Sequence, residues 1–497
     1  MAVSSTMLSP EALREHQAVP HRLLAVSSQF SAHQRIVLSA GQEATIRAQN
    51  GVFCTRGGPG SGKTTALLRH AEAHRDRVDR RGVLFVRDAS ERQRIEPQLA
   101  RRARGFATQT LLGFAVQMTR TPFRQNLVQE NPPALIVEQW GTPLPVAAIA
   151  IRALEIFFRS VDAQPDARHI SSHDQIFAMK ASDLGAGIDT ARQVWSAMLR
   201  GEFPLTREAC FKLYARSLPV MPFDTILVDD AEDLSPVMLD LLRRQRHATV
   251  IYAGDPYQAP QSHRSIFDDV VSHESAIGVF DLGQSWRMTQ PIAGLAGRAL
   301  SLVGVEGAIK GKADESGPMW DTRLAVIGRS TGVLVEKAAE CAGFGVHWLG
   351  GCEGLGRLLS VYHQFAGRRE HVQDGVVQNF ASYDVLKDFA LFAGDEDLLS
   401  LARVVERYGH DTPALAMEIL DNAVQARAEQ CAEVYVTAQQ AKGHSWDRVL
   451  LAGDFDCTAD GVDREDARQL YLAISRANRE IEMTSAVKER LAMAAAT

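Results

Sequence analysis

Short apolar runs bounded by turn residues recur along the chain, and segments with helical periodicity lie between them. The clearest runs are 51–54, 83–86, 225–228, 248–252, 324–327, 434–436 and 449–451. Each run has the length of a buried strand, and strands that alternate with helices are typical of parallel α/β units. The runs form two clusters, before and after about residue 281, so the pattern predicts two α/β domains.

Two stretches depart from this alternation and are mainly helical, as in 147–154 and the amphipathic segment 398–405. We expect one helical insertion in each α/β domain. The division that this predicts is an N-terminal extension at 1–37, a first domain at 38–115 and 203–280 with an insertion at 116–202, and a second domain at 281–353 and 427–497 with a reduced insertion at 354–426.

Composition limits the class of protein without naming a function. The hydrophobic fraction of 45% is ordinary for a soluble globular chain, and the net charge of −6 gives no global attraction to nucleic acid, although a local basic groove would suffice. Residues 1–20 lack the order of a signal peptide, and no apolar run approaches the roughly 18 residues that span a membrane. The six cysteines form no C-x-x-C pair, so a reduced cytoplasm is expected.

The strongest chemical signal is the run 57–64, which reads GGPGSGKT and matches the P-loop pattern G-x-x-x-x-G-K-[ST]. It lies between an apolar run and a helical segment, which is the context of a working P-loop rather than of a chance glycine-rich turn. Glycines let backbone N–H groups point at a polyphosphate, Lys63 reaches the β- and γ-phosphates, and the Thr64 hydroxyl can ligate Mg²⁺. The sequence therefore predicts ATP binding by Gly57, Gly58, Pro59, Gly60, Ser61, Gly62, Lys63, Thr64 and Thr65.

An acidic pair ends the apolar run 225–228. A P-loop site needs one acid to hold Mg²⁺ and one to orient the attacking water, and Asp229 and Asp230 fit these two roles. The alternative is the start of an acidic loop that continues with Glu232 and Asp233, and the P-loop upstream weakens it.

Two separated arginines, Arg287 and Arg476, follow a further motif that ends at Gln258. Phosphoryl transfer builds negative charge on the γ-phosphate oxygens, and guanidinium groups stabilise that charge in a fixed geometry. An isolated arginine is usually a surface residue, so these two gain weight from their order with the other motifs.

This ordered series resembles the superfamily 1 DNA helicases of the UvrD/Rep/PcrA type over residues 38–480. The matching segments are Gln42, 57–64, 108–114, 229–233, 254–258, 437–447 and 471–477. Residues 284–287 with 292–293, and also 326–331 and 454–455, look closest to the F-box DNA helicases and their short bacterial relatives. The stretch before Gln42 is too short for an F-box, so no ubiquitin-ligase function is expected.

The resemblance implies two RecA-like domains with ATP between them. Gln42 would read the adenine and Trp286 would stack on it, Lys63, Thr64, Asp229, Asp230 and Gln258 would act from the first domain, and Arg287 and Arg476 from the second. Closing and opening of the cleft would then drive stepping along single-stranded DNA with 3′-to-5′ polarity.

The implied DNA contacts are Thr108, His263, Arg264, Lys442 and Trp446. A groove of this kind combines phosphate contacts with stacking under bases. Two alternatives stay open here, a solvated loop position for His263 and core packing for Trp446.

Four positions depart from the family pattern. Asp230 replaces a glutamate and is one methylene shorter, Glu232 replaces a glutamine, Ser445 replaces a ribose-holding glutamate, and 87–90 replace a Thr-Phe-Thr-Asn stretch that contacts DNA. These changes leave ATP binding expected and put strong hydrolysis, nucleotide choice and unwinding in question.

The leading hypothesis is an ATP-dependent DNA translocase or helicase in repair, recombination or foreign-DNA handling. The runner-up is a weakly hydrolysing ATP switch that recruits a partner such as a nuclease, which the residues at 230 and 232 favour. An RNA-directed or metabolic P-loop kinase fits poorly, because kinases do not need the two late arginine motifs in this order.

Overall fold

The computed structural model describes thirteen ranges of the chain, and all structural statements below refer to them. These ranges are 38–75, 81–119, 127–128, 133–170, 181–258, 277–305, 309–312, 323–340, 346–349, 353–393, 395–425, 431–456 and 464–494. The predicted extension at 1–37 lies outside them.

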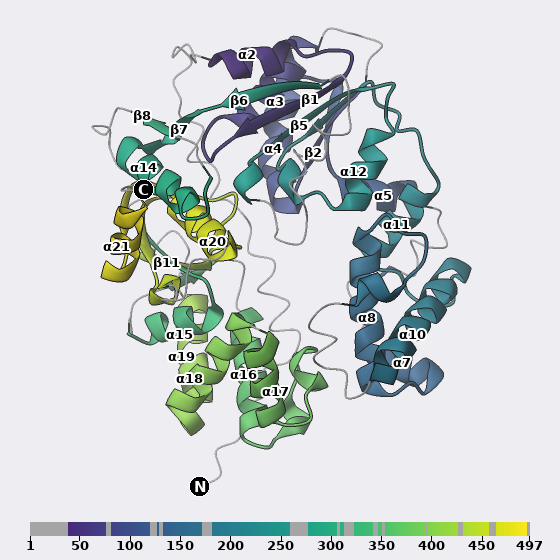
Figure 1. Ribbon diagram of the computed structural model, residues 1–497, viewed down its shortest axis with the longest axis vertical. Coiled ribbons are helices and arrows are strands. Elements are labelled where there is room, and N and C mark those ends of the chain that lie inside the picture. Colours follow the sequence, from purple (N-terminus) through teal and green to yellow (C-terminus); the bar gives the residue numbers. More distant parts are fainter. Residues whose placement is uncertain are drawn as a thin grey trace.

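The first lobe is built on a sheet of six parallel strands in the order β3-β2-β4-β5-β1-β6. Its strands are β1 (Val52–Gly57), β2 (Gly82–Val86), β3 (Phe106–Thr110), β4 (Thr225–Val228), β5 (Thr249–Gly254) and β6 (Ile277–Leu282). Its helices are α2 (Ala40–Arg47), α3 (Lys63–Ala73), α4 (Ala89–Arg102), α5 (Leu111–Met118) and α12 (Pro236–Arg243). Figure 1 shows this lobe at the top of the view.

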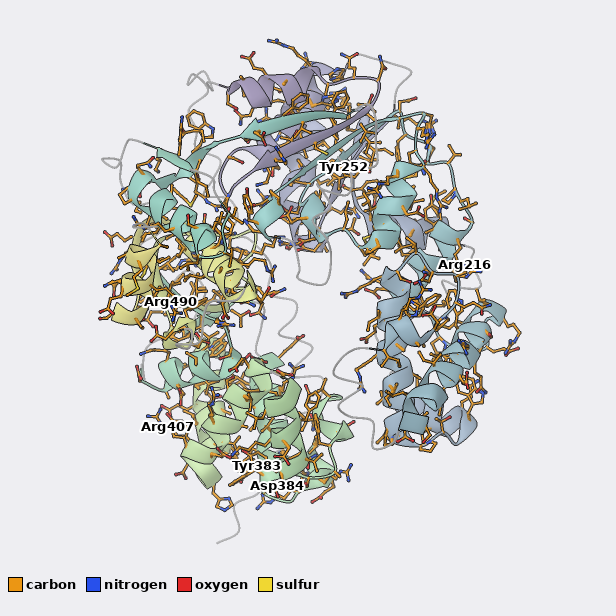
Figure 2. All side chains as sticks on the ribbon, viewed as in Figure 1. Arg216, Tyr252, Tyr383, Asp384, Arg407 and Arg490 are labelled. Atoms are coloured by element: carbon orange, nitrogen blue, oxygen red, sulfur yellow. The ribbon has the colours of Figure 1, made fainter. Side chains whose placement is uncertain are left out.

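Both faces of the first sheet are covered, and strands β2, β4 and β5 are buried at every position. Successive side chains of a strand point to opposite faces. Val83 and Phe85 of β2 pack in one core cluster with α5 and α12, whereas Leu84 and Val86 pack in another with α3 and α4. Tyr252 of β5 lies inside this lobe (Figure 2).

The second lobe is built on five parallel strands in the order β10-β11-β9-β12-β13. Its strands are β9 (Leu324–Gly328), β10 (Val346–Trp348), β11 (Glu433–Thr437), β12 (Trp446–Leu451) and β13 (Ala477–Glu482), and its helices are α14 (Gln290–Ser301), α15 (Thr331–Glu340), α20 (Arg464–Ile474) and α21 (Ser485–Met493). A separate parallel pair, β7 (Gln284–Thr289) and β8 (Lys310–Lys312), lies next to α14.

The first helical group comprises α7 (Pro133–Trp140), α8 (Leu144–Arg159), α10 (Ala181–Arg200) and α11 (Arg207–Arg216). It has a core of its own, in which α8 and α10 pack side by side. Figure 1 shows the group extending away from the first sheet, to which α11 connects it.

The second helical group comprises α16 (Glu353–Phe365), α17 (Tyr383–Ala393), α18 (Glu396–Tyr408) and α19 (Thr412–Gln425). It shares one hydrophobic cluster with the second sheet, because Val326 of β9 and Tyr435 of β11 pack with Leu401 of α18. Tyr383 and Arg407 lie in this group, at the far end from the first sheet (Figure 2).

The fold class that the sequence predicts is confirmed: the chain is α/β, with two parallel sheets consistent with RecA-like domains and a helical insertion in each. All seven apolar runs lie on strands, namely β1, β2, β4, β5, β9, β11 and β12. Strands β3, β6, β7, β8, β10 and β13 had no clear apolar run, because they are short or carry polar positions. The residue boundaries of the lobes and insertions stay predictions.

Short 3₁₀ helices at Ala167–His169, Ala231–Asp233, Pro256–Gln258, Arg369–His371, Val377–Asn379, Gly409–Asp411 and Gly453–Phe455 complete the described elements. Among the described helices, none is both long and apolar enough to cross a bilayer.

The shared cluster predicts that the second helical group and the second sheet unfold together. Leu401 is 0% exposed, so Leu401→Ala should lower the free energy of unfolding by about 2–5 kcal/mol and raise amide exchange in β9 and β11. Chemical denaturation and hydrogen exchange measure both effects. Leu391→Ala, at a position that is 65% exposed, is the control. Faster exchange confined to α16–α19 would contradict the prediction.

Candidate active site

The carboxyl ends of four parallel strands meet at one edge of the first sheet and carry the predicted site. The P-loop follows β1, Arg87 follows β2, Asp229 follows β4 and Asp255 follows β5. In open parallel sheets ligands bind outside this edge, because loops from several strands converge there.

The P-loop has the conformation that its glycines allow. Gly60 and Gly62 have φ angles of 72° and 85°, in the left-handed region, and Gly62 is the N-cap of α3. The first turn of α3 contains no acidic residue and no side chain caps it, so its backbone N–H groups face the loop. Such an N-terminus attracts phosphate through both hydrogen bonds and the helix dipole.

Two polar side chains of the loop mark where an anion fits. Lys63 Nζ donates hydrogen bonds to the carbonyls of Gly57 at 2.7 Å and Gly58 at 3.1 Å. Ser61 Oγ is buried and has no hydrogen-bond partner among the described residues. A buried hydroxyl without a partner is unfavourable, and a phosphate oxygen would satisfy it.

The two residues expected to hold Mg²⁺ contact each other. Thr64 Oγ1 donates a hydrogen bond of 2.6 Å to Asp229 Oδ2. Burial, together with the charge of Asp230, raises the pKa of Asp229 to about 7. In the described part of the chain no group of three or more His, Cys, Asp or Glu could hold a metal by itself. This fits Mg²⁺, which is typically bound by one or two protein groups together with substrate phosphates.

Asp230 has a left-handed backbone, with φ at 49°. This conformation is uncommon outside glycine, although Asp and Asn tolerate it. It reverses the chain directly after β4, and the carboxylate then lies 3.7 Å from NH1 of Arg87.

The motif after β5 is bonded across the lobes. Gln258 Nε2 donates to Asp255 Oδ2 at 2.6 Å, and the hydroxyl of Tyr471 on α20 donates to the same oxygen at 2.8 Å. Asp255 is buried, so these bonds satisfy a carboxylate that would otherwise be costly to bury.

Strand β7 brings the second lobe to the P-loop. The backbone N–H of Trp286 donates a hydrogen bond to the Gly60 carbonyl at 2.8 Å, and Ser285 Oγ donates one to the Pro59 carbonyl at 2.9 Å. A Cβ added at Gly60 would lie 2.5 Å from Cβ of Arg287. Glycine at position 60 is therefore required twice, for its φ angle and for this close approach.

The two predicted arginines meet at Ser475. Arg287 NH2 donates to the Ser475 carbonyl at 2.9 Å, and Arg476 NH2 donates to Ser475 Oγ at 2.8 Å. Burial lowers the pKa of Arg287 to about 9, to which Arg476 adds, and burial lowers the pKa of Arg476 to about 10. Neither arginine forms an ion pair with a carboxylate within the described ranges, so this corner is suited to an anion.

Gln42 and Trp286 flank Gly62. Gln42 Nε2 donates to the carbonyls of Ser61 at 3.3 Å and Gly62 at 3.4 Å, while the Trp286 ring lies 3.9 Å from the position of a Cβ on Gly62. Trp286 is 48% exposed, so its ring is open beside the P-loop. An open aromatic face of this kind can stack on a base.

The predicted DNA contacts are placed differently. Trp446 is 4% exposed and packs in the core of the second lobe, Thr108 is buried, and Lys442 is ion-paired with Asp233 at 2.7 Å. In this arrangement none of these three groups offers an open face to a base or phosphate, and their DNA contacts stay predictions. His263 and Arg264 lie outside the described residues.

Three residues near the site had no role in the sequence prediction: Arg87, Ser285 and Tyr471. The position of Arg87 could have been inferred from the sequence, since it directly follows the carboxyl end of a buried strand, where the residues of P-loop sites lie. Ser285 and Tyr471 had none, because their partners are 226 and 216 residues away along the chain.

No protein-family model matches the chain. F-box DNA helicase 1 of Gallus gallus is 26% identical over 398 residues, which are 69% of this chain and 38% of that protein. F-box DNA helicase protein 1 of Schizosaccharomyces pombe is 23% identical over 408 residues, which are 71% of this chain and 45% of that protein. The chain is similar to DNA helicases. It spans less than half the length of these two relatives.

The contact at Gly60 gives a direct test of the site. Gly60→Ala adds a Cβ against Arg287 and Ser285, and its left-handed backbone costs about 1–2 kcal/mol for a residue with a Cβ. A loop that relaxes to relieve this strain must regain it on binding, so we expect affinity for a fluorescent ATP analogue to fall about 5- to 30-fold, since about 1.4 kcal/mol corresponds to a factor of ten. Gly294→Ala is the control, because a Cβ there meets nothing within 4 Å. Equal affinities in the two variants would contradict the prediction.

Proposed function

We propose that the chain is an ATP-dependent translocase or helicase on single-stranded or tailed duplex DNA, of the superfamily 1 UvrD/Rep/PcrA type. The observation that carries this proposal is the seating of β7 on the P-loop. Through Ser285 and Trp286 the second lobe contacts the phosphate-binding loop of the first, and two buried arginines follow directly behind. A nucleotide bound there would contact both lobes.

Each predicted residue has a role in this proposal. Trp286 and Gln42 hold the adenine, the P-loop backbone and Lys63 hold the phosphates, and Thr64 and Asp229 hold Mg²⁺. Held there, Mg²⁺ would neutralise charge that develops on the phosphate oxygens. Asp230 orients the attacking water, Gln258 contacts the γ-phosphate, and Arg287 and Arg476 stabilise the charge that builds up on transfer.

The movement follows from the position of the arginines. Because they belong to the second lobe, their attraction for the γ-phosphate closes the lobes, and its loss after hydrolysis lets them separate. Repeated closure would move the protein along one DNA strand, with 3′-to-5′ polarity expected from the family resemblance. Repair, recombination or foreign-DNA handling in the cytoplasm, with a nuclease or repair protein as partner, is the setting we propose.

The test is ATP turnover with and without single-stranded DNA. We expect stimulation by the strand, loss of turnover in Lys63→Ala, and a fall in kcat of about 10³-fold in Arg287→Ala, since an arginine finger contributes at least that much. Arg244→Ala, at an ion pair on the surface, is the matched control, and circular dichroism confirms folding. Strand displacement on 3′-tailed and 5′-tailed duplexes tests polarity.

ATP turnover that is unchanged by single-stranded DNA would contradict the proposal that the chain is a DNA motor. Equal displacement of both tailed duplexes would overturn the polarity while leaving the motor in place.

A second candidate is an ATP-binding switch that hydrolyses weakly and recruits another DNA-processing protein. Lys442 of the second lobe forms ion pairs with Glu232 at 3.1 Å and with Asp233 of the first lobe. These ion pairs link the two lobes without requiring ATP hydrolysis. The short Asp230 would also place the attacking water less well.

Asp230→Glu separates the two candidates. In a damped motor the longer carboxylate reaches the water, so we expect kcat to rise about tenfold or more, within the range that general-base catalysis contributes. A switch protein would show no gain, and its ATP affinity would be unchanged. Steady-state turnover and nucleotide titration of the same samples give both numbers.

A further inference from the structure

Arg87, at the end of β2, connects three groups that are distant in the sequence. Its Nε lies 2.8 Å from Asp88 Oδ2, its NH1 lies 3.7 Å from Asp230 Oδ2, and its NH2 donates to the Lys442 carbonyl at 3.3 Å. Asp230 belongs to the first lobe and Lys442 to the second. One guanidinium group therefore touches both the proposed water-orienting residue and the opposite lobe.

Asp88 fixes the base of this side chain. Although burial opposes it, hydrogen bonds from Ser90, from the Glu91 N–H and from Arg87 lower the pKa of Asp88 to about 2. Asp88 is also the N-cap of α4. Its charge is thus permanent near neutral pH and its position is set by the helix.

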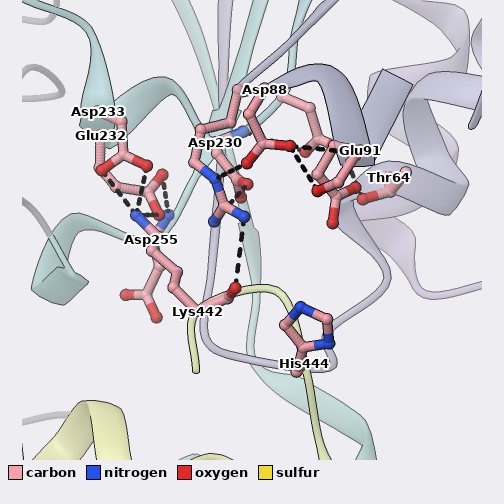
Figure 3. A network of polar contacts seen from close by, with 12 residues as sticks. Thr64, Asp88, Glu91, Asp230, Glu232, Asp233, Asp255, Lys442 and His444 are labelled. Atoms are coloured by element: carbon pink, nitrogen blue, oxygen red, sulfur yellow. Dashed lines mark hydrogen bonds and ion pairs between the residues drawn. The ribbon is translucent and has the colours of Figure 1, made fainter. Parts of the chain in front are cut away.

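The second lobe presses on Arg87 through the loop at 442–443. Lys442 Nζ lies between Glu232 and Asp233, as Figure 3 shows, so this residue is held at both its side chain and its carbonyl. Gly443 has a φ of 87°, and a Cβ there would lie 3.1 Å from Arg87 NH2. A residue with a Cβ at position 443 would be strained by this φ angle and would crowd the guanidinium group of Arg87.

Several carboxylates lie close to Asp230, and a nearby cation would reduce their mutual repulsion. Asp229, Asp230, Glu232 and Asp233 lie within one turn of chain, and among the described residues Arg87 is the partner within ion-pair distance of Asp230. Its NH1 is buried and has no hydrogen-bond partner in the described ranges. A small shift of the Asp230 carboxylate towards NH1 would turn the 3.7 Å contact into a hydrogen bond.

We propose that Arg87 is a positioning residue that holds the Asp230 carboxylate for hydrolysis and releases it when the 442–443 loop of the second lobe moves away. The proposal rests on the proposed function of the ATP site. It makes lobe closure a condition for water activation, because the NH2 contact that fixes the guanidinium exists while the loop is seated. Arginine suits this role, since its planar fork reaches three acceptors at once and a lysine ammonium does not.

The experiment compares Arg87→Gln and Arg87→Lys with Arg92→Gln, a control on the following helix α4 whose partner Glu96 lies one turn further along. Steady-state kinetics in the full chain give kcat and KM for ATP. We expect kcat to fall at least about tenfold in Arg87→Gln with KM within about twofold, because misplacement of a catalytic group by 1 Å costs about 10²-fold in rate. Arg87→Lys keeps the charge and should recover part of kcat.

A double-mutant cycle links the effect to Asp230. If Arg87 acts through Asp230, Arg87→Gln should lower kcat no further in an Asp230→Asn background. Independent, multiplying losses would overturn the proposal, as would a rise in KM with kcat unchanged, which would make Arg87 an ATP-binding residue.

Hydrogen exchange tests the contact between lobes without hydrolysis. Arg87→Gln should speed amide exchange in a peptide covering 438–446, and Arg92→Gln should not. If the wild-type chain binds ATP and does not hydrolyse it, the proposed function fails, and the exchange result still decides whether Arg87 holds the loop. Unchanged exchange in Arg87→Gln would overturn that part of the proposal.

Discussion

The structure depends on the seating of β7 on the P-loop. Two hydrogen bonds to loop carbonyls, from the Trp286 N–H and from Ser285 Oγ, bring the second lobe within van der Waals contact of Gly60. Both bonds end on backbone carbonyls, and the bond from Ser285 is buried. Moving β7 away from the P-loop would therefore leave buried polar groups without partners. They determine where the Trp286 ring and the Arg287 side chain lie relative to a bound triphosphate.

Charge is distributed unequally between the lobes at this contact. The first lobe contributes the buried carboxylates Asp229 and Glu232, whose pKa values burial raises to about 7. The second lobe contributes Lys442 and the two buried arginines. Burial of unpaired charge is unfavourable, so the carboxylates of the first lobe and the cationic side chains of the second lobe partly neutralise each other. A magnesium nucleotide would add further charges of both signs at this contact. Opening the lobes would expose both the carboxylates and the cationic side chains to water. The stability of the closed state would therefore depend on whether a charged ligand is bound between the lobes.

The two helical groups relate to their sheets in different ways. The first has a core of its own and joins the cluster of the first sheet through Phe211 and Tyr214 of α11, whereas the second packs directly on β9 and β11 and shares their hydrophobic cluster. A group that shares a core with its sheet cannot rotate against it without exposing apolar side chains. We therefore expect the second lobe and its helices to move as one body.

The sequence by itself determined the parallel α/β class, the strands that are apolar on both sides, and the P-loop with its acidic and arginine motifs. These are local properties, because alternation, glycine spacing and turn residues act between near neighbours in the chain. It did not reveal β3 or β13, whose polar positions hide the strand pattern, and it left open whether Trp446 is a core residue. The contacts of Ser285 and Tyr471 were decided by tertiary structure alone. Their partners are distant in the chain, and a hydrogen bond between distant segments exists only when folding brings both ends to the same place.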